Sequence, residues 1–295
     1  MSDYVISCCS TADLTQEQFD AKDIKFLLFN FELDGKQYKD DLGVSMPFTE
    51  FYKHMEEGLM TKTSQPNATD YDEYFRPMLE EGKDIIHLVL SSGISGAINS
   101  AKISESNMRD EFPDRKIYVI DSLAACGGFG LIMNKMADLK AAGMGIDELK
   151  DWVEENKLNS NHWFFPTDLT YLVRGGRVSK TSGFFGNMLN ICPLLNVDYE
   201  GRLIPRAKIR TKKKVIQATA DKMLELANNG ADYNEECIIN HSDCYDDAKA
   251  LADAIVERMP NLKDKIIINY IGTTIGSHTG PGTVALFFWG QKRVD

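Results

Sequence analysis

The residues best suited to chemistry lie in a serine- and glycine-rich stretch at positions 91–96, with the sequence Ser-Ser-Gly-Ile-Ser-Gly. Residues 85–90 before it are nearly all apolar, which is typical of a strand covered on both faces, and the residues after it predict a helix. The amino end of a helix carries unpaired N–H groups and a positive dipole, so this loop is suited to a carboxylate or phosphate. The simpler alternative is an ordinary strand-to-helix turn in which Ser95 caps the helix.

The second candidate is His278, which lies among three glycines and a proline in the segment 276–282. A glycine-rich loop can bring an imidazole close to a ligand, where the ring can donate a hydrogen bond to a carboxylate. The alternative is a histidine that is simply satisfied at the surface or in the core. The other four histidines lie in predicted helices or strands, and we interpret them as structural: His54, His87, His162 and His241.

Ser95 and His278 together also suggest an alternative function, a serine-dependent hydrolase of an ester or an acyl phosphate. A nucleophilic serine needs a base and an orienting acid, and Asp121, at the end of the next predicted strand, is a candidate acid. The residues around Ser95 do not form the GxSxG motif, however. The sequence also lacks the phosphate loop GxxxxGK(S/T) and the dinucleotide motif GxGxxG with its acid, which disfavours a nucleotide site.

The composition limits the classes of partner. The chain has 295 residues and a net charge of -11, which argues against a general nucleic-acid or anionic-membrane binder. No window reaches the roughly 20 apolar residues of a membrane-spanning helix, so we expect no stable membrane insertion, and we see no signal peptide. The six cysteines form no CxxC pair and no zinc-type cluster, so we expect reduced thiols, no metal and a cytoplasmic location.

The order of the predicted elements indicates an α/β fold with two domains. Strands alternating with helices in the first half predict a Rossmann-like parallel sheet with flanking helices. Ligands of such sheets bind beyond the carboxyl ends of the strands, where the 91–96 loop and Asp121 both lie. A solvated helix at 146–158 predicts a boundary, which gives an N-terminal domain at 1–158 and a C-terminal mixed-sheet α/β domain at 159–295.

Several local patterns make narrower predictions. Residues 15–18 form a capping box, and Thr69 with Asp72 predicts the cap of a later helix. Residues 25–31 predict a single strand. The apolar run 184–189 predicts a helix, and such a run is more often core than part of a ligand tunnel.

Basic side chains are concentrated at residues 202–214. A solvated surface is the simplest interpretation of this stretch. A docking patch for an acidic partner, or a cradle near a phosphate, is the functional alternative. Under that alternative we predict that Arg174, Arg206 and Arg210 face the partner or its phosphate.

Six short segments, taken in order, are similar to the motifs of a known family. Each is weak alone, but their order and spacing together are specific. The segments are Ser10 to Leu14 (STADL), Thr63 to Pro66 (TSQP), Ser91 to Gly96 (SSGISG), Asp121-Ser122, Gly175 to Val178 (GGRV) and His278 to Gly282 (HTGPG). On these segments the chain resembles the DegV family over nearly its whole length.

The resemblance implies a two-domain α/β protein that binds one fatty acid in a buried tunnel at the domain interface. By this resemblance Thr63 and Ser95 match hydroxyls that hold the fatty-acid carboxylate, and His278 matches a histidine that supports them. The neighbours of the carboxylate would be Ser64, Gly96 and Thr279. Two positions depart from the family pattern: Cys9 replaces a frequent Asp, and Ala97-Ile98 replaces a common Thr-Tyr.

The resemblance also implies a biochemical role. Such a protein is not a catalyst and uses no cofactor. It resembles the acyl-binding subunit of bacterial fatty acid kinase, which presents the carboxylate of a long-chain fatty acid to an ATP-dependent kinase subunit. It then carries the acyl phosphate to an acyltransferase for phospholipid synthesis.

Overall fold

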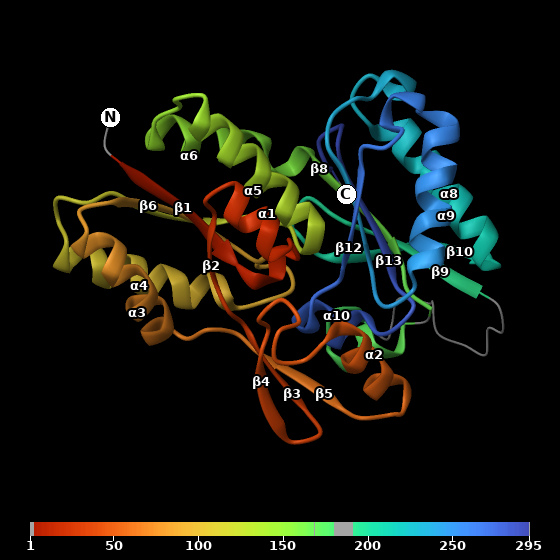
Figure 1. Ribbon diagram of the computed structural model, residues 1–295, viewed down its shortest axis with the longest axis horizontal. Coiled ribbons are helices and arrows are strands. Elements are labelled where there is room, and N and C mark those ends of the chain that lie inside the picture. The colour runs from red at the N-terminus through yellow and green to blue at the C-terminus, as the bar shows by residue number, and fades with distance from the viewer. Residues whose placement is uncertain (1–2, 168, 180–190, 295) are drawn as a thin grey trace.

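The computed structural model describes residues 3–167, 169–179 and 191–294, and these residues form three β-sheets (Figure 1). The first sheet has four strands in the order β2-β1-β6-β7, and every pair is parallel. Its strands are β1 (Tyr4–Cys9), β2 (Lys25–Leu27), β6 (Asp84–Val89) and β7 (Ile117–Asp121). The central strands β1 and β6 are buried at every residue because helices cover both faces of the sheet. The prediction of a parallel N-terminal sheet is confirmed.

The helices of this part lie in two layers (Figure 1). Helices α3 and α4 pack together on one face of the sheet, and α5 and α6 pack on the other. The helices are α1 (Gln16–Ala21), α3 (Ala68–Glu80), α4 (Ala97–Glu111), α5 (Cys126–Ala141) and α6 (Ile146–Asn156).

The second sheet has six strands in the order β10-β9-β8-β13-β11-β12. Only β11 and β12 are parallel among its described pairs, so the sheet is mixed, as predicted for the C-terminal half. Its strands are β8 (Ser160–Phe165), β9 (Ile191–Val197), β10 (Leu203–Arg210), β11 (Cys237–His241), β12 (Ile266–Tyr270) and β13 (Val284–Trp289). Helices α8 (Lys212–Leu226) and α9 (Tyr245–Arg258) cover one face of this sheet.

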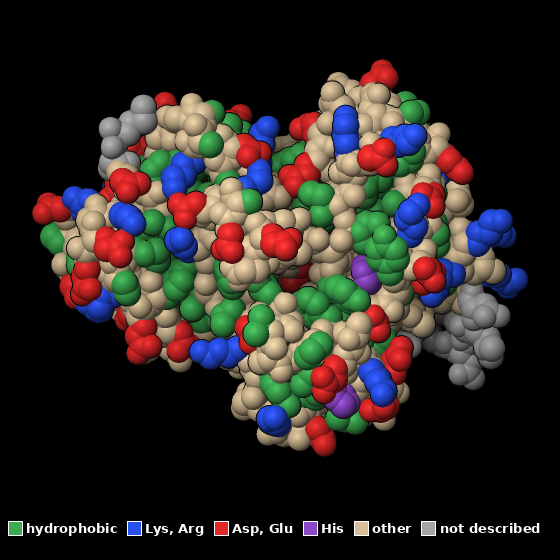
Figure 2. Space-filling view, viewed as in Figure 1, with side chains coloured by type: hydrophobic (Ala, Val, Ile, Leu, Met, Phe, Trp, Pro, Cys, Tyr) green, Lys and Arg blue, Asp and Glu red, His purple; other side chains and the backbone are tan. Residues whose placement is uncertain are grey.

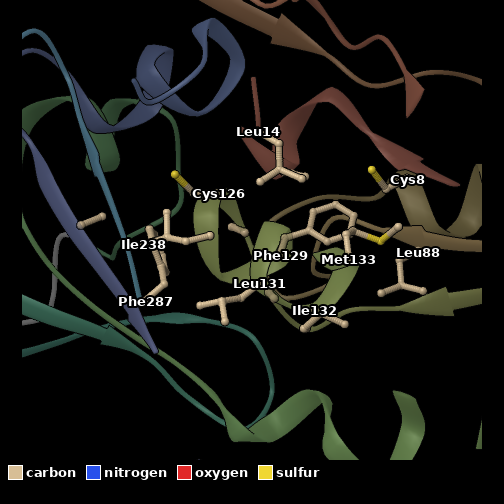
Figure 3. Close-up of a cluster of buried hydrophobic side chains, with 14 of the residues drawn as sticks. Cys8, Leu14, Leu88, Cys126, Phe129, Leu131, Ile132, Met133, Ile238 and Phe287 are labelled. Carbon is tan, nitrogen blue, oxygen red and sulfur yellow. The ribbon is translucent and has the colours of Figure 1, made fainter. Parts of the chain in front are cut away.

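Helix α5 joins the two large sheets because it packs against strands of both. Figure 3 shows its side chains in contact with the first sheet through Cys8 and Leu88, and with the second through Ile238 and Phe287. Glycines make the close approach possible, since a Cβ atom at Gly127 would collide with Asn240 and one at Gly128 with His162. The helix is therefore buried along most of its length.

The third sheet is small and has the order β4-β3-β5. Its strands are β3 (Asn30–Leu33), β4 (Lys36–Lys39) and β5 (Thr61–Ser64), and they share a core with α2 (Phe48–Glu56). Helix α10 (Thr273–Thr279), near the other end of the chain, packs on β3, β5 and α2, and on α7 (Thr170–Arg174). The small sheet thus places the β5 end of the N-terminal half directly against the C-terminal half.

The structure differs from some of the local predictions and confirms another. The expected strand at 25–31 is two strands, β2 and β3, because the chain leaves the first sheet and enters the third. The predicted cap at Thr69 is wrong: Asn67 caps α3, and its side chain accepts hydrogen bonds from the N–H groups of Thr69 and Asp70. The capping box at 15–18 is confirmed.

The helix predicted at 184–189 lies outside the described residues. Over the ranges that the structure does describe, no helix is both long and apolar enough to span a membrane.

Candidate functional site

A cavity of about 310 Å³ lies where the first sheet, the second sheet and α10 meet. Its walls are mainly apolar and come from every layer, including Leu90 after β6, Phe164 on β8, Leu203 on β10, Ile275 on α10 and Phe287 on β13. This volume is within the range of about 300–1,000 Å³ that is typical of small-molecule sites. Figure 2 shows one face of the molecule, where hydrophobic side chains border a hollow near the middle of the view.

Polar side chains gather at one part of the cavity wall. Thr63 is on β5, Ser95 follows β6, and His278 is in the last turn of α10. The Thr63 Oγ1 atom lies 2.8 Å from His278 Nε2, although the two residues are 215 positions apart in the chain. Of the six predicted carboxylate-binding residues, the structure brings five to the cavity wall, namely Thr63, Ser64, Ser95, His278 and Thr279.

The sixth, Gly96, does not line the cavity. It is exposed and acts as the N-cap residue of α4, where Ser95 was expected. Ser95 still contributes to the cap, because its Oγ accepts a hydrogen bond of 3.2 Å from the N–H of Ala97. The same hydroxyl donates to Gln65 Oε1 at 3.4 Å, which is a weak contact. A ligand oxygen can therefore compete for the Ser95 proton at little cost.

His278 lies in a helix, whereas the glycine pattern predicted a loop. The helix ends at Gly280, whose φ of 77° is in the left-handed region that glycine adopts readily. Burial lowers the pKa of His278 to about 4, and the charges of Arg177 and Arg174 act in the same direction. The ring is therefore neutral at pH 7.

A neutral ring has one N–H donor, and its position decides what Thr63 can do. If Nε2 carries the proton, it donates to Thr63 Oγ1 and leaves the Thr63 hydroxyl free to donate to a ligand. His278 Nδ1 is buried and has no hydrogen-bond partner among the described residues. A Cβ atom at Gly175 would overlap Nδ1, so only glycine leaves room for the imidazole there.

The same geometry does not assemble a hydrolase triad. His278 Nε2 bonds to Thr63, and no carboxylate of the described residues bonds to the ring. The candidate acid Asp121 instead accepts hydrogen bonds from the N–H groups of Ser92 and Leu123. Asp121 thus holds the loops at the end of the first sheet and does not orient His278.

Ser91, the first serine of the candidate anion loop, is also occupied. Its buried hydroxyl donates to the carbonyl of Gly201 at 2.8 Å and accepts from the N–H of Gly93 at 3.1 Å. Gly201 lies in the turn of the β9–β10 hairpin, so this contact ties the second sheet to the first. Ser91 joins the two sheets and leaves Ser95 as the serine of this loop that lines the cavity.

Arg177 and His162 are among the residues of the cavity wall that the sequence did not single out. Arg177 is half-buried there, donates to the Ile94 and Gly175 carbonyls, and has no carboxylate partner among the described residues. Burial lowers its pKa. It lies in the GGRV segment, which was noted without a role. His162, interpreted as structural, also lines the cavity. Its Nε2 accepts a hydrogen bond of 3.4 Å from the N–H of Ala125, the N-cap residue of α5.

The three arginines predicted to face a partner do not line the cavity. Arg174 is exposed beside Met60 and over the ring of Tyr171, and Arg206 donates to Asn196 at 2.8 Å. Arg206 and Arg210 point to solvent from β10, the edge strand of the second sheet. Within the described part of the chain, no group of three or more His, Cys, Asp or Glu side chains is arranged to hold a metal.

Comparisons with known proteins agree with this architecture. A family model described as "Uncharacterised protein, DegV family" matches residues 6–291. The chain belongs to the DegV family. A DegV domain-containing protein of Clostridium perfringens is 40% identical to it over 296 residues, covering 99% of each chain.

Solved structures of DegV proteins have the same fold. A DegV lipid-binding protein from Thermotoga maritima is 30% identical, with a TM-score of 0.79 and coverage of 99% of both chains. A DegV family protein from Thermus thermophilus, described by its fatty acid binding, is 26% identical, with a TM-score of 0.85 over 99% of this chain and 100% of its own. The resemblance to the DegV family and the predicted fold class are therefore confirmed.

Proposed function

We propose that this DegV-family protein binds one long-chain fatty acid. The carboxylate would lie beside Thr63, Ser95 and His278, with Ser64, Gly96 and Thr279 nearby, and the acyl chain would fill the cavity. The observation that carries the proposal is the Thr63–His278 hydrogen bond at a polar part of a mainly apolar cavity wall. The DegV relatives described as lipid- or fatty-acid-binding support it.

The energetics favour such a ligand. Burial of an acyl chain contributes about 0.8 kcal/mol per methylene group, or on the order of 10 kcal/mol for a long chain. The carboxylate needs hydrogen-bond donors at the cavity, because an unpaired buried charge is costly. The hydroxyls of Thr63 and Ser95 supply the donors, the neutral imidazole supports Thr63 by donating to it, and the half-buried Arg177 guanidinium supplies a positive charge nearby.

We further propose that the protein is a carrier and not a catalyst. Ser64 and Gln65 line the cavity and are exposed, so the carboxylate end would be accessible to an ATP-dependent fatty acid kinase subunit in the cytoplasm. The acyl phosphate would then pass to an acyltransferase for phospholipid synthesis. Arg174, Arg206 and Arg210 are exposed and remain our proposed contacts for such a partner. We place the boundary between domains 1–158 and 159–295 just before β8, with the cavity at their interface.

Native mass spectrometry of protein purified from bacteria tests the ligand. We expect a bound mass equal to one acyl chain, and a lower melting temperature after delipidation, because a ligand that binds only the folded state stabilises it. A protein that carries no lipid and whose stability does not respond to delipidation would contradict the proposal.

Calorimetric titration of the delipidated protein tests the position of the head group. Ser95→Ala should weaken binding of a fatty acid by roughly tenfold or more, since a hydrogen bond to a charged group contributes about 1.5–3 kcal/mol. It should have less effect on a fatty alcohol of the same length. Ser91→Ala is the matched control, because Ser91 bonds to Gly201 and not to the cavity. An esterase turnover abolished by Ser95→Ala would instead favour the hydrolase.

A further inference from the structure

Two buried carboxylates lie close together beneath the cavity, at the amino end of α10. Asp13 follows the 3-10 turn Ser10–Ala12 and is 5% exposed, and Asp40 follows β4 and is 1% exposed. A Cβ atom at Gly272 would lie 2.5 Å from Asp13 Oδ1 and 3.3 Å from Asp40 Oδ1, so both carboxylates face the same glycine. Like charges this close and this buried cannot both be ionised without a large penalty.

Burial raises the pKa of Asp40, but hydrogen bonds from Thr274 and Thr273 act in the opposite direction and stabilise the ionised carboxylate. Its Oδ1 accepts from the hydroxyl of Thr273 at 2.8 Å and from the Thr273 N–H at 3.3 Å. Its Oδ2 accepts from the Thr274 N–H at 3.3 Å and from the Ser10 hydroxyl at 3.4 Å. Asp40 thus caps the first turn of α10, where a negative charge is favoured.

The surroundings of Asp13 differ. Neither of its carboxylate oxygens makes a hydrogen bond of normal geometry with the described residues. Burial and the charge of Asp40 raise the pKa of Asp13 to well above 3.8. The Cys126 thiol and the Gly272 N–H act in the opposite direction, but their effect is smaller. The titratable groups that act on the pair are Cys126 from α5 and Tyr52 from α2, and no Lys, Arg or His of the described residues forms an ion pair with it.

We infer that Asp13 keeps its proton in the folded protein and lies as a neutral carboxylic acid beside the ionised Asp40, so that the pair holds the first turn of α10 in place. A shared proton resolves the repulsion between two neighbouring buried carboxylates when no cation is present. Asp13 and Asp40 are then positioning residues, which act on the cavity through α10.

The pair is connected to the cavity by two residues. Cys126 contacts Asp13, Thr274 donates its N–H to Asp40, and both line the cavity. Thr274 and His278 are four positions apart on α10, so they lie on the same face of the helix. Loss of the Asp13 proton would place a second charge beneath this turn and disturb the helix that carries His278. This consequence for ligand binding rests on the proposed function, whereas the protonation of Asp13 does not.

The protonation predicts a specific dependence of stability on pH. A carboxyl group whose pKa is raised on folding stabilises the folded state below its unfolded pKa of 3.8, and this contribution is lost as pH rises through the folded value. Asn resembles a neutral carboxylic acid in shape and also tolerates the left-handed backbone of Asp13, whose φ is 50°. The Asp13→Asn variant should therefore fold normally, and its free energy of unfolding should not show the decrease that Asp13 causes as pH rises above 3.8.

Denaturant unfolding of the delipidated protein as a function of pH is the decisive measurement, with Asp40→Asn as the matched variant. We expect Asp13→Asn to reduce the release of protons on unfolding by up to one between pH 3.8 and the folded pKa of Asp13, and Asp40→Asn to lower the unfolding midpoint at every pH. The second effect follows because an amide nitrogen cannot accept from the N–H groups of α10. Infrared spectra with labelled aspartate should show one carboxylic acid band near neutral pH that Asp13→Asn removes.

Three results would overturn the inference. The first is the absence of that band, and the second is an Asp13→Asn variant that is destabilised as much as Asp40→Asn at every pH. The third is a stability that falls on removal of alkali or divalent cations, because a cation would then neutralise the pair. In a separate titration, fatty-acid affinity should fall as pH rises through the Asp13 transition and should not fall in Asp13→Asn. If only this titration failed, it would contradict the coupling between Asp13 and the ligand. The protonation of Asp13 in the delipidated protein would still hold.

Discussion

The buried His87 on β6 and the half-buried His278 on α10 have similar charge states and different surroundings. Burial lowers the pKa of His87 to about 3 and that of His278 to about 4, so both rings are neutral at pH 7. His87 has a partner at each nitrogen, with Ser7 Oγ at 2.7 Å and Cys9 Sγ at 3.8 Å. His278 has Thr63 at one nitrogen and no described partner at the other, and it borders a cavity.

The difference separates a closed polar cluster from an open one. The rings of Tyr71, Tyr74 and Phe75 surround His87 within 6.0 Å, and His87 does not line the cavity that His278 borders. Cys9 Sγ lies 3.6 Å from Tyr71 Oη within this cluster. Buried polar groups normally have partners, and the polar cluster around His87 is complete, whereas His278 keeps one unpaired nitrogen at the border of a cavity. The same residue type is structural in one cluster and a candidate for binding in the other.

The largest effect should come from the closed cluster. His87→Ala removes a fully buried ring from the first sheet and should lower the free energy of unfolding by about 3 kcal/mol, as for other large-to-small core changes. Fatty-acid affinity of the folded fraction should not change, because His87 does not border the cavity. Denaturant unfolding and calorimetric titration measure the two quantities. A large loss of fatty-acid affinity without a loss of stability would show that His87 takes part in binding and is not structural.

A smaller effect should follow from removal of the hydroxyl that His278 holds. Thr63→Val keeps the side-chain shape and should weaken fatty-acid binding by roughly ten- to a hundredfold, with little change in stability. Thr61→Val, on the same strand, is the control. Thr61 donates to the Ser277 carbonyl at 3.3 Å and does not line the cavity, so its loss should leave affinity unchanged. Equal effects of the two substitutions would show that β5 acts only through the fold.

The smallest effect is a shift in the titration of the histidines, followed by NMR. A bound carboxylate should raise the pKa of His278 by roughly one unit and leave that of His87 unchanged, because a nearby negative charge favours the protonated ring. In the apoprotein, the neutral His278 stabilises the folded state above its unfolded pKa of 6.5, and this contribution is lost as pH falls towards 4. A His278 pKa that does not respond to ligand would place the carboxylate elsewhere.

Much of the fold follows from local patterns. The apolar run at β6 and the alternation of strands and helices predict a parallel sheet, because hydrophobic periodicity depends only on neighbouring residues. The helix at His278 did not follow, since glycine and proline around it resemble a loop, and contacts with β3, β5, α2 and α7 stabilise the helix. Arg177 was missed as a cavity residue because its burial depends on the packing of α7 beside α10.

The sequence by itself determined the types of residue that the site can use, a threonine, a serine and a histidine in segments similar to DegV motifs, and the two classes of sheet that carry them. Only the tertiary structure decided that Ser95 and not Ser91 reaches the cavity, that His278 bonds to Thr63, and that Asp13 lies beside Asp40. The physical reason is that these outcomes depend on hydrogen-bond partners and on burial. Both are supplied by distant segments, 215 positions apart for Thr63 and His278 and 233 for Asp40 and Thr273, so no local pattern can specify them.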